Sequence, residues 1–384
     1  MGLPINSMNL IYITNSRLPT EKAYGYQIVK MCEQFAELGV EVVLLAPSKK
    51  NSIEKEPFEF YDVKKNFKFK KISCPDFFVL EKYLGELVFY LQSFYFFVKL
   101  CFYNFGRPAI IYSRNPEIIW QFSRRGYRTV YDAHIWPASK LRLFKFFLKK
   151  VDKIVYSSRG LENEFKANGF KPILVAPNGV DLKKIAVKET GEELRQLFRL
   201  PLNKKIVMYA GHLYGWKGVA SLLEAARLMK QEPDLIFVLV GGTAGDVTKH
   251  KNLIEQNELG NILLCGHQPH ELILKYFKCA DVLLLPNSAQ SKVSAWYTSP
   301  IKMFEYMASR RPIIASDLPS LREILNEGNC LFFRPDDAGD LAEKIKQLLN
   351  DPLLAEKISK QALADVQPYG WDKRAQKIIK FIAA

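Results

Sequence analysis

The chain alternates short apolar runs with helical patterns, and this alternation constrains the fold more than any other feature. The run LIYIT at residues 10–14 is followed by a helical pattern at 26–38, which ends at Gly39, and then by VEVVLLA at 40–46. These runs are continuously apolar, which is typical of parallel strands buried on both faces. Strands that alternate with helices predict a doubly wound α/β domain. Further runs of this series lie at residues 109–113, 129–133, 153–158 and 173–181.

A second series of the same kind begins near residue 205. The run KIVMYAG at 205–211 leads into a glycine-containing turn and a helical pattern at 220–230. A chain of 384 residues also favours two domains at about 150 residues each. We therefore expect two Rossmann-like domains, residues 1–180 and 181–366, which face a central cleft along the carboxyl ends of both sheets. The second series continues with apolar runs at 235–242, 261–266, 281–286 and 311–316 and helical patterns at 271–279 and 300–309.

The net charge of +15 is concentrated in the first half of the chain. Residues 1–178 hold 27 Lys and Arg against 16 Asp and Glu, whereas residues 179–384 hold 28 against 24. Such an excess would attract an anionic partner. From charge alone, nucleic acid, anionic lipid and phosphorylated small molecules all stay open.

The six cysteines and the chain start indicate the compartment. No two cysteines form a CxxC pair, which argues against structural zinc and suits free thiols in a reducing cytoplasm. The opening MGLPINS lacks a basic segment followed by a long apolar run, so we expect no signal peptide. The most apolar stretch, residues 87–98, is too short to span a bilayer. We therefore expect a cytoplasmic protein.

The segment GHLYGWKG at 211–218 is the first candidate for chemistry. It follows a strand, and its three glycines precede a helix. Turns of this kind present backbone N–H groups and a helix N-terminus to a phosphate. Lys217 places a cation near the helix start, where the helix dipole disfavours it, so an anion is expected there. The alternative is an exposed loop lysine.

The segment at 297–316, YTSPIKMFEYMASRRPIIAS, is the second candidate. Ser299 and Pro300 are predicted as the N-cap and first residue of a helix. Lys302 and Glu305 follow on that helix, where a cation and a carboxylate could hold a pyrophosphate and a ribose. The alternative is a surface Lys–Glu pair, which stabilises a helix by about 0.2–0.5 kcal/mol.

These two segments, together with LREILNEGNCLFFRPDDAGDLAEKIKQLLND at 321–351, resemble the C-terminal domain of retaining family 4 glycosyltransferases. The resemblance implies the GT-B fold, with a nucleotide-sugar bound mainly by the second domain. The ending YGWDKRAQKIIKFI is similar to the family's closing helix. We therefore expect residues 367–384 to form a helix that crosses back to the first domain.

The resemblance also assigns residues. Lys217 matches the family lysine on the donor diphosphate, and Glu305 matches the glutamate on the donor ribose. His134, in VYDAHIW, matches the active-site histidine near the 6-position of the transferred sugar. Gly25, in PTEKAYGYQ, corresponds to a glycine-rich loop after the first strand, beside the diphosphate. These assignments make His134, Lys217 and Glu305 the candidate catalytic residues.

Two positions depart from the family pattern. His212 stands where an arginine is expected, and Tyr297 stands where the family has the first glutamate of its pair. We expect Ser299, Lys302 and the helix N-terminus to replace the missing diphosphate and sugar contacts. The nucleotide base is expected near two further donor-binding residues, Gly242 and Gln268, the latter in the loop GHQPH at 266–270.

The chemistry that follows is transfer of a hexose-type sugar from a UDP- or GDP-sugar to a hydroxyl group. Departure of the diphosphate builds negative charge, which fixed cations and helix N-termini stabilise. The sequence contains no DxD motif, so we expect neither a metal nor a cofactor beside the donor. The resemblance implies retention of anomeric configuration, and no residue stands out as a covalent nucleophile.

Two segments bear on the acceptor. Residues 77–105 contain 12 aromatic residues in 29 and predict one long helix, which is either a core helix or an interfacial helix. Residues 140–153 predict a basic amphipathic helix, which is either a solvated face or a contact with an anionic membrane. Our hypothesis is a peripheral enzyme at the inner face of the plasma membrane that acts on a glycan or lipid-linked acceptor in envelope polysaccharide or glycolipid synthesis.

Two other classes compete with this interpretation. A nucleotide-sugar epimerase can share the two-domain architecture, but we identify no acid or base suited to C2 of a sugar. A nucleic-acid binder would suit the charge, but the basic residues do not form a recognisable RNA- or DNA-binding motif. We therefore expect no nucleic-acid partner.

Overall fold

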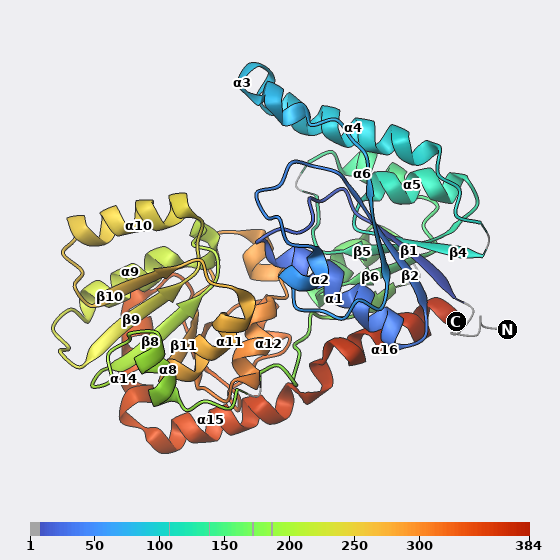
Figure 1. Cartoon of the computed structure of the whole chain (residues 1–384). Helices are drawn as coiled ribbons and strands as arrows, with labels where there is room; N and C mark the ends of the chain where they lie inside the picture. The colour runs from blue at the N-terminus through green and yellow to red at the C-terminus, as the bar shows by residue number, and fades with distance from the viewer. Residues whose placement is uncertain (1–7, 107, 138, 171–172, 186) are drawn as a thin grey trace. The chain divides into compact units, whose positions relative to one another are not determined.

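The computed structural model describes residues 8–106, 108–137, 139–170, 173–185 and 187–384 (Figure 1). The opening heptapeptide, on which the expectation of no signal peptide rests, lies outside them. The chain forms two compact units. The first comprises Met1–Ser157, Leu161–Ala176 and Trp371–Ala384, and the second comprises Ser158–Gly160 and Pro177–Gly370. The prediction of two doubly wound parallel α/β sheets is confirmed.

The first unit is built on a seven-stranded parallel sheet in the order β3-β2-β1-β4-β5-β6-β7. Alternate residues of its strands serve opposite faces. Ile11 and Ile13 of β1 join a cluster with Phe96 and Phe122, whereas Tyr12 packs on Tyr112 on the other face. Both faces are therefore covered by helices, as continuously apolar strands require. The strands are β1 (Asn9–Ile13), β2 (Glu41–Pro47), β3 (Lys68–Ile72), β4 (Ala109–Ser113), β5 (Arg128–Ala133), β6 (Lys153–Tyr156) and β7 (Ile173–Val175).

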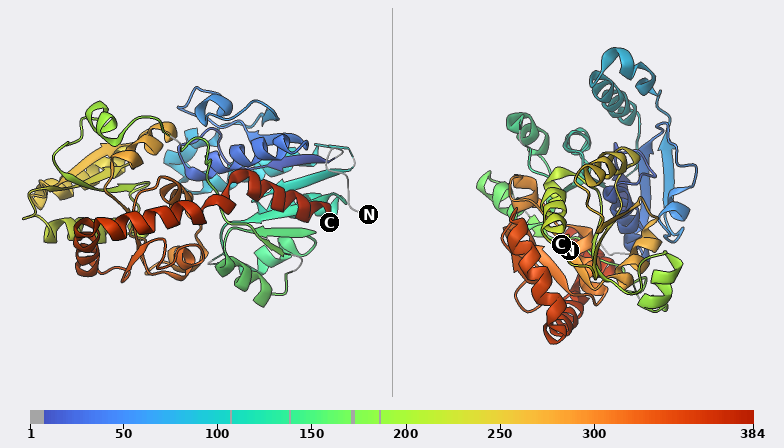
Figure 2. Two further views of the ribbon diagram at one scale, coloured as in Figure 1. Left: turned by 90° about the horizontal axis from the view of Figure 1, so that it is seen from below. Right: turned by 90° about the vertical axis from the view of Figure 1, so that its left-hand side faces the viewer.

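The helices of the first unit include the last helix of the chain, α16, which packs along α1. Figures 1 and 2 show α16 beside the strands of this sheet, and α3 and the start of α4 projecting beyond them. The helices are α1 (Ala23–Glu37), α2 (Pro57–Phe60), η2 (Phe77–Leu80), α3 (Glu81–Leu84), α4 (Leu87–Cys101), α5 (Pro116–Arg124), α6 (Leu141–Leu148), α7 (Arg159–Ala167) and α16 (Trp371–Ala383).

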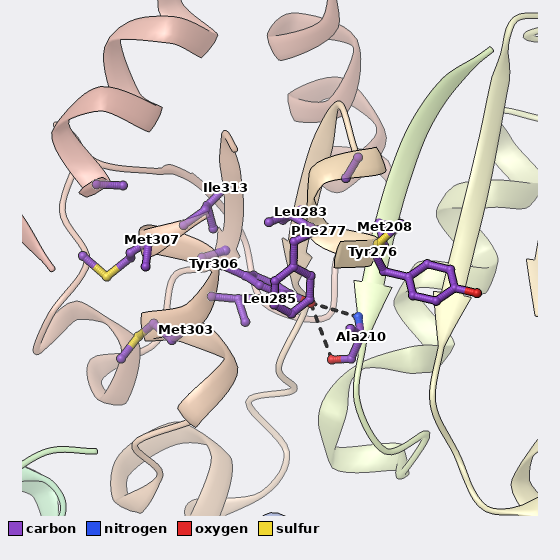
Figure 3. Packing of buried hydrophobic residues seen from close by; sticks show 14 of the residues in the cluster. Met208, Ala210, Tyr276, Phe277, Leu283, Leu285, Met303, Tyr306, Met307 and Ile313 are labelled. Carbon is purple, nitrogen blue, oxygen red and sulfur yellow. Dashed lines mark hydrogen bonds between the residues drawn. The ribbon is translucent and has the colours of Figure 1, made fainter. Parts of the chain in front are cut away.

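The second unit has a six-stranded parallel sheet in the order β10-β9-β8-β11-β12-β13. One face packs Met208 and Leu283 against Phe277 and Tyr306, as Figure 3 shows, and the other packs Val207 and its neighbours under α9 and α14. The strands are β8 (Lys205–Ala210), β9 (Leu235–Val240), β10 (Ile262–Gly266), β11 (Val282–Leu285), β12 (Ile313–Ser316) and β13 (Leu331–Phe333). The helices are α8 (Gly191–Leu197), η3 (Gly215–Lys217), α9 (Val219–Leu228), α10 (Ala244–Gln256), α11 (His270–Cys279), the π-helix η4 (Val293–Tyr297), α12 (Ile301–Ala308), α13 (Pro319–Arg322), α14 (Ala338–Asn350), α15 (Pro352–Asp365) and η5 (Gln367–Tyr369).

The prediction of one helix over residues 77–105 is wrong. The segment is divided into η2, α3 and α4, and α4 ends at Cys101. Gly85, with φ of +51°, ends α3, because that backbone conformation cannot continue a right-handed helix. Within the described part of the chain, no helix is both long and apolar enough to cross a membrane. The six cysteines are free thiols.

Candidate functional site

The candidate donor site lies where the strand order of the second sheet changes direction. The chain moves outward from β8 to β9 and β10 on one side and continues from β11 on the other, so the loops after β8 and β11 diverge there. Open parallel sheets bind ligands at this switch point. Gly218, with φ of +74°, brings the two loops together, since an added Cβ would lie 1.5 Å from the Pro286 carbonyl oxygen.

Lys302 extends its ammonium group to this edge of the sheet. Its Nζ lies 3.8 Å from the centre of the Tyr209 ring and is buried without a hydrogen-bond partner in the described structure. A Cβ built on Gly211 would be 3.6 Å from that nitrogen, which places it beside the loop after β8. Burial, and then the charge of Lys217, hold the pKa of Lys302 well below its usual value.

Lys217 is the second cation of this edge. It ends the 3₁₀ turn η3, two residues before α9, and its Nζ lies 3.8 Å from the centre of the Trp216 ring. Burial lowers its pKa to about 7. The ring of His212 stacks on Tyr214 at 4.9 Å, and Tyr214 stacks on Trp216. Lys217 and Lys302 thus both place their side-chain nitrogens over aromatic rings at this edge of the sheet.

Helix α12 is anchored to the end of β8 by Tyr306. The Tyr306 hydroxyl accepts a hydrogen bond from the Ala210 backbone N–H at 2.9 Å, and both residues are buried (Figure 3). Met303 and Met307, on the same helix, pack into the cluster shown there. This packing fixes the helix that carries Lys302 and Glu305 against the strand that precedes Gly211.

Glu305 is 6% exposed and pairs with His270. The His270 Nε2 lies 2.6 Å from the Glu305 Oε1. His270 is the first residue of α11, directly after the loop that contains Gln268. The pair therefore fixes one carboxylate oxygen of Glu305.

Ser299 does not cap α12. The N-cap is Pro300, no side chain caps the helix, and the first helical residue is Ile301. The Ser299 hydroxyl instead accepts a hydrogen bond from the Asn178 backbone N–H at 3.1 Å, while Asn178 Nδ2 donates to the Ser299 carbonyl at 2.6 Å. The prediction of a Ser299 N-cap is wrong, because the Ser299 hydroxyl is hydrogen-bonded to the buried backbone N–H of Asn178 instead of to the start of α12.

Three other predicted donor residues lie in the second unit. Tyr297 ends the π-helix η4 and is buried. Gly242 follows β9. Gln268 lies in the loop after β10, and its side-chain amide donates a hydrogen bond to the backbone carbonyl of Cys265 in that strand. Gly241, beside Gly242, has φ of +118°, and an added Cβ would lie 2.4 Å from the Gly211 carbonyl oxygen, so the loops after β8 and β9 touch.

His134 belongs to a buried charge network in the first unit. Its Nε2 lies 3.0 Å from Asp132 Oδ2, and the same carboxylate accepts from Arg114 Nε at 3.0 Å and from Arg374 at 3.3 Å. Burial raises the pKa of Asp132, but His134, Arg114 and Arg374 outweigh it and hold that pKa well below its usual value. Burial, and then Arg114, lower the pKa of His134 to about 4, so its ring is neutral at pH 7.

Gly25 lies in a helix rather than in a loop. It is the third residue of α1, and a Cβ built on it would lie 2.1 Å from the Tyr61 hydroxyl and 2.6 Å from Thr20. The loop position predicted for Gly25 is therefore wrong. Its small size makes room for Tyr61, whose hydroxyl donates to the Thr20 carbonyl.

The sequence analysis missed several residues that contact the predicted site residues in the two units. Asp132 stands two residues before His134, and His270 closes the GHQPH loop, so both lie inside segments that drew attention. Tyr209 sits inside an apolar run and gives no separate signal. Arg374 is 242 residues from Asp132, and no local pattern joins them. Among the described residues, no group of three or more His, Cys, Asp or Glu side chains could hold a metal ion.

Sequence comparison matches both halves of the chain to glycosyltransferases. Residues 25–184 match the family described as Glycosyltransferase Family 4, and residues 191–365 match Glycosyl transferases group 1. The putative teichuronic acid biosynthesis glycosyltransferase TuaC of Bacillus subtilis (strain 168) is 24% identical over 267 residues, which cover 68% of this chain. The match spans 63% of TuaC, less than two thirds of its length.

Solved structures share the fold along nearly the whole chain. HepE of Anabaena, in complex with UDP and glucose, matches with a TM-score of 0.76 at 16% identity and covers 98% of this chain and 100% of its own. Sucrose-phosphate synthase of Thermosynechococcus elongatus matches with a TM-score of 0.73 at 20% identity, over 97% of this chain and 98% of its own. At these identities the likeness establishes the fold alone.

The fold and the two matched regions define a glycosyltransferase of the GT-B fold. Within that class, this chain belongs to the group 1 glycosyltransferases of family 4.

Proposed function

We propose that this chain transfers a hexose-type sugar from a UDP- or GDP-sugar to a hydroxyl of a glycan or lipid-linked acceptor. The observation that carries this proposal is the pair of ammonium groups on Lys217 and Lys302. They lie near one another at the switch point of the second sheet, and neither makes an ion pair with a described residue. Cations kept from water without a carboxylate partner are costly, and a diphosphate would compensate them.

The two lysines would act on the leaving group. When the sugar–phosphate bond breaks, negative charge grows on the departing diphosphate, and cations fixed beside it stabilise that state most. This role needs no metal, in line with the absence of a DxD motif from the sequence. The start of α12, which no side chain caps, would add backbone N–H groups.

Glu305 would bind the donor ribose. His270 engages its Oε1, so the other carboxylate oxygen can accept a hydrogen bond from a ribose hydroxyl. We assign His270 as a positioning residue for Glu305. The loops that carry Gly242 and Gln268 would border the base.

His134 would contact the transferred sugar. A neutral imidazole that donates from Nε2 to Asp132 keeps Nδ1 as an acceptor, so it can accept a hydrogen bond from a sugar hydroxyl. Membership of family 4 supports retention of anomeric configuration, with the acceptor hydroxyl attacking on the face from which the diphosphate leaves. The relative TuaC is named for teichuronic acid biosynthesis, which supports a glycan acceptor.

A product assay tests the reaction. Radiolabelled UDP-glucose, UDP-N-acetylglucosamine and GDP-mannose are each incubated with the protein and a membrane lipid extract, with and without EDTA. We expect a labelled glycoside whose anomeric configuration equals that of the donor, in equal yield with the chelator. A free epimer of the donor sugar would instead identify an epimerase, and loss of product with EDTA would contradict the metal-independent mechanism.

A further inference from the structure

Helix α4 has two apolar faces, of which one has no covering layer. Phe96 and Leu100 are buried in the core of the first unit. On the other side, Phe89, Tyr90 and Phe94 are 52%, 60% and 66% exposed. The outer face of a surface helix in a water-soluble protein is normally polar. These aromatic residues therefore do not serve the core.

The exposed apolar surface continues beyond α4. Val79 of η2 and Tyr83 of α3 are largely exposed, as is Phe102 just after α4. Figures 1 and 2 show that α3 and the start of α4 project from the first unit. Contiguous apolar surface of this extent marks an interaction site. We call this surface the aromatic face, defined by Val79, Tyr83, Phe89, Tyr90, Phe94 and Phe102.

A basic hollow lies on the neighbouring helix α6. It has a volume of about 410 Å³, and Arg142, Lys145 and Lys149 line it together with Phe146 and Phe170. No acidic residue occurs between positions 133 and 151. The hollow therefore presents positive charge without local compensation.

Contacts join the aromatic face to this hollow. Lys140, which precedes α6, places its Nζ 5.4 Å from the centre of the Tyr90 ring. Trp120 of α5 stacks on Phe97 of α4 at 6.2 Å and contacts Phe146 of α6 at 5.8 Å. The three helices thus form one platform, with aromatic side chains on one part and basic side chains on the next.

We propose that this platform binds the surface of an anionic lipid bilayer. The aromatic face enters the interfacial layer, and Arg142, Lys145 and Lys149 bind lipid phosphate groups. Aromatic rings flanked by Lys and Arg are the composition that suits this layer. A second copy of the chain fits less well, because a two-fold contact would bring the basic hollows of both copies together. The proposal stands independently of the sugar transferred.

Vesicle flotation tests the proposal with the full chain. Vesicles of phosphatidylcholine alone are compared with vesicles that also contain phosphatidylglycerol, at low and high salt. We expect binding to the anionic vesicles that high salt weakens. Reversing the exposed charges in Arg142→Glu with Lys149→Glu should lower partitioning at least about 30-fold, since each basic residue contributes on the order of 1 kcal/mol.

Matched variants separate the surface from general charge and apolarity. Tyr90→Ser with Phe94→Ser should lose most of the binding, whereas Leu353→Ser, at an 80% exposed position of α15, should keep it. Lys249→Glu with Lys357→Glu changes the net charge equally at exposed sites of the second unit and should leave most of the binding intact.

Three results would overturn the proposal. The first is a wild-type protein that fails to float with anionic vesicles at low salt, which no folding defect can explain. The second is equal binding of the platform variants and the matched controls. The third is a stable dimer in analytical ultracentrifugation that Phe94→Ser dissociates, because the aromatic face would then belong to a second copy.

Discussion

Lys302 places an ammonium group where the apo protein offers it only an aromatic ring. Replacing it by methionine keeps a chain of similar length and removes the buried, unpartnered nitrogen. We therefore expect Lys302→Met to stabilise the apo protein by about 1–3 kcal/mol, the cost of an unpaired buried polar group. The same change should weaken binding of a nucleotide-sugar. Urea unfolding and calorimetric titration measure the two effects.

A gain in stability together with a loss of donor affinity distinguishes a ligand-binding lysine from a structural one. The exposed Lys357→Met is the control, and it should change neither quantity beyond about 0.5 kcal/mol. If Lys302→Met destabilises the protein and leaves donor affinity unchanged, Lys302 is part of the core packing instead.

The transfer rate should depend on the positive charge of the Lys217 side chain. We expect Lys217→Ala to reduce kcat/KM for the donor by about 10- to 150-fold, because a hydrogen bond to a charged group contributes about 1.5–3 kcal/mol. Steady-state kinetics at low and saturating donor measure the loss. Unchanged rates at both concentrations would exclude Lys217 from the diphosphate site.

Donor binding should also take up a proton at Lys217. Its pKa is about 7 because burial disfavours the ammonium form, so above pH 7 the amine is mostly neutral in the free protein. A diphosphate beside it favours the charged form and raises the pKa. The contribution of Lys217 to affinity should therefore be nearly constant below pH 7 and fall as the pH rises above 7, by at most about tenfold per pH unit.

Calorimetry at pH 8 in two buffers of different ionisation enthalpy measures that proton. The nucleotide-sugar itself does not titrate in this range, so the apparent binding enthalpy should differ between buffers for the wild type. Lys217→Met should reduce the difference. Identical enthalpies in both buffers for the wild type would mean that no lysine changes protonation when the donor binds.

At the scale of elements, a buried ion pair near the start of α16 joins this helix to β5. Arg374 reaches Asp132 at 3.3 Å and the Ala176 carbonyl at 3.1 Å, and both charged side chains are buried. Arg374→Ala should destabilise the first unit by about 3–5 kcal/mol, since it leaves a buried carboxylate less well compensated. Its exposed neighbour Lys373→Ala should cost less than about 0.5 kcal/mol. Equal urea midpoints for the two variants would contradict this account.

The sequence predicts the central strands well and the edge strands poorly. Central strands such as β1 and β8 are continuously apolar because helices cover both faces. The edge strand β3, KFKKI, carries three lysines, which protect an edge from pairing and also hide it from an apolar pattern. The edge strand β13 has only three residues. Gly85 breaks the aromatic segment because its backbone conformation is left-handed, which composition does not reveal.

The sequence also predicts the chemistry-bearing residues better than their partners. Lys217 and His134 stand in short segments directly after strands, where parallel sheets place their sites. Tyr209, whose ring lies under the Lys302 nitrogen, is distant from Lys302 in the sequence. Arg374, which pairs with Asp132, is likewise distant from that carboxylate in the sequence. Ser299 shows the same limit, because a buried amide of Asn178 outcompetes the predicted helix cap. Local patterns carry no information about such long-range competition.

At the scale of the whole molecule, the two units divide the charge in different ways. The first half holds most of the net charge, and part of it surrounds the basic hollow on α6. The second half is closer to neutral, yet two of its lysines place their nitrogens over aromatic rings at one edge of its sheet. A charged surface suits a large anionic partner, whereas a pair of partly buried lysines without a carboxylate partner suits a small anion.

The most direct measurement of the central claim is thermal unfolding of the wild type and of the Lys217→Met, Lys302→Met double variant with UDP-, GDP- and dTDP-sugars. At about 100 times its dissociation constant, the correct donor should stabilise the wild type by about 2.7 kcal/mol. The double variant, tested at the same concentration, should lose most of that stabilisation. Absence of any shift in the wild type, or an equal shift in both proteins, would contradict a diphosphate seat formed by these two lysines.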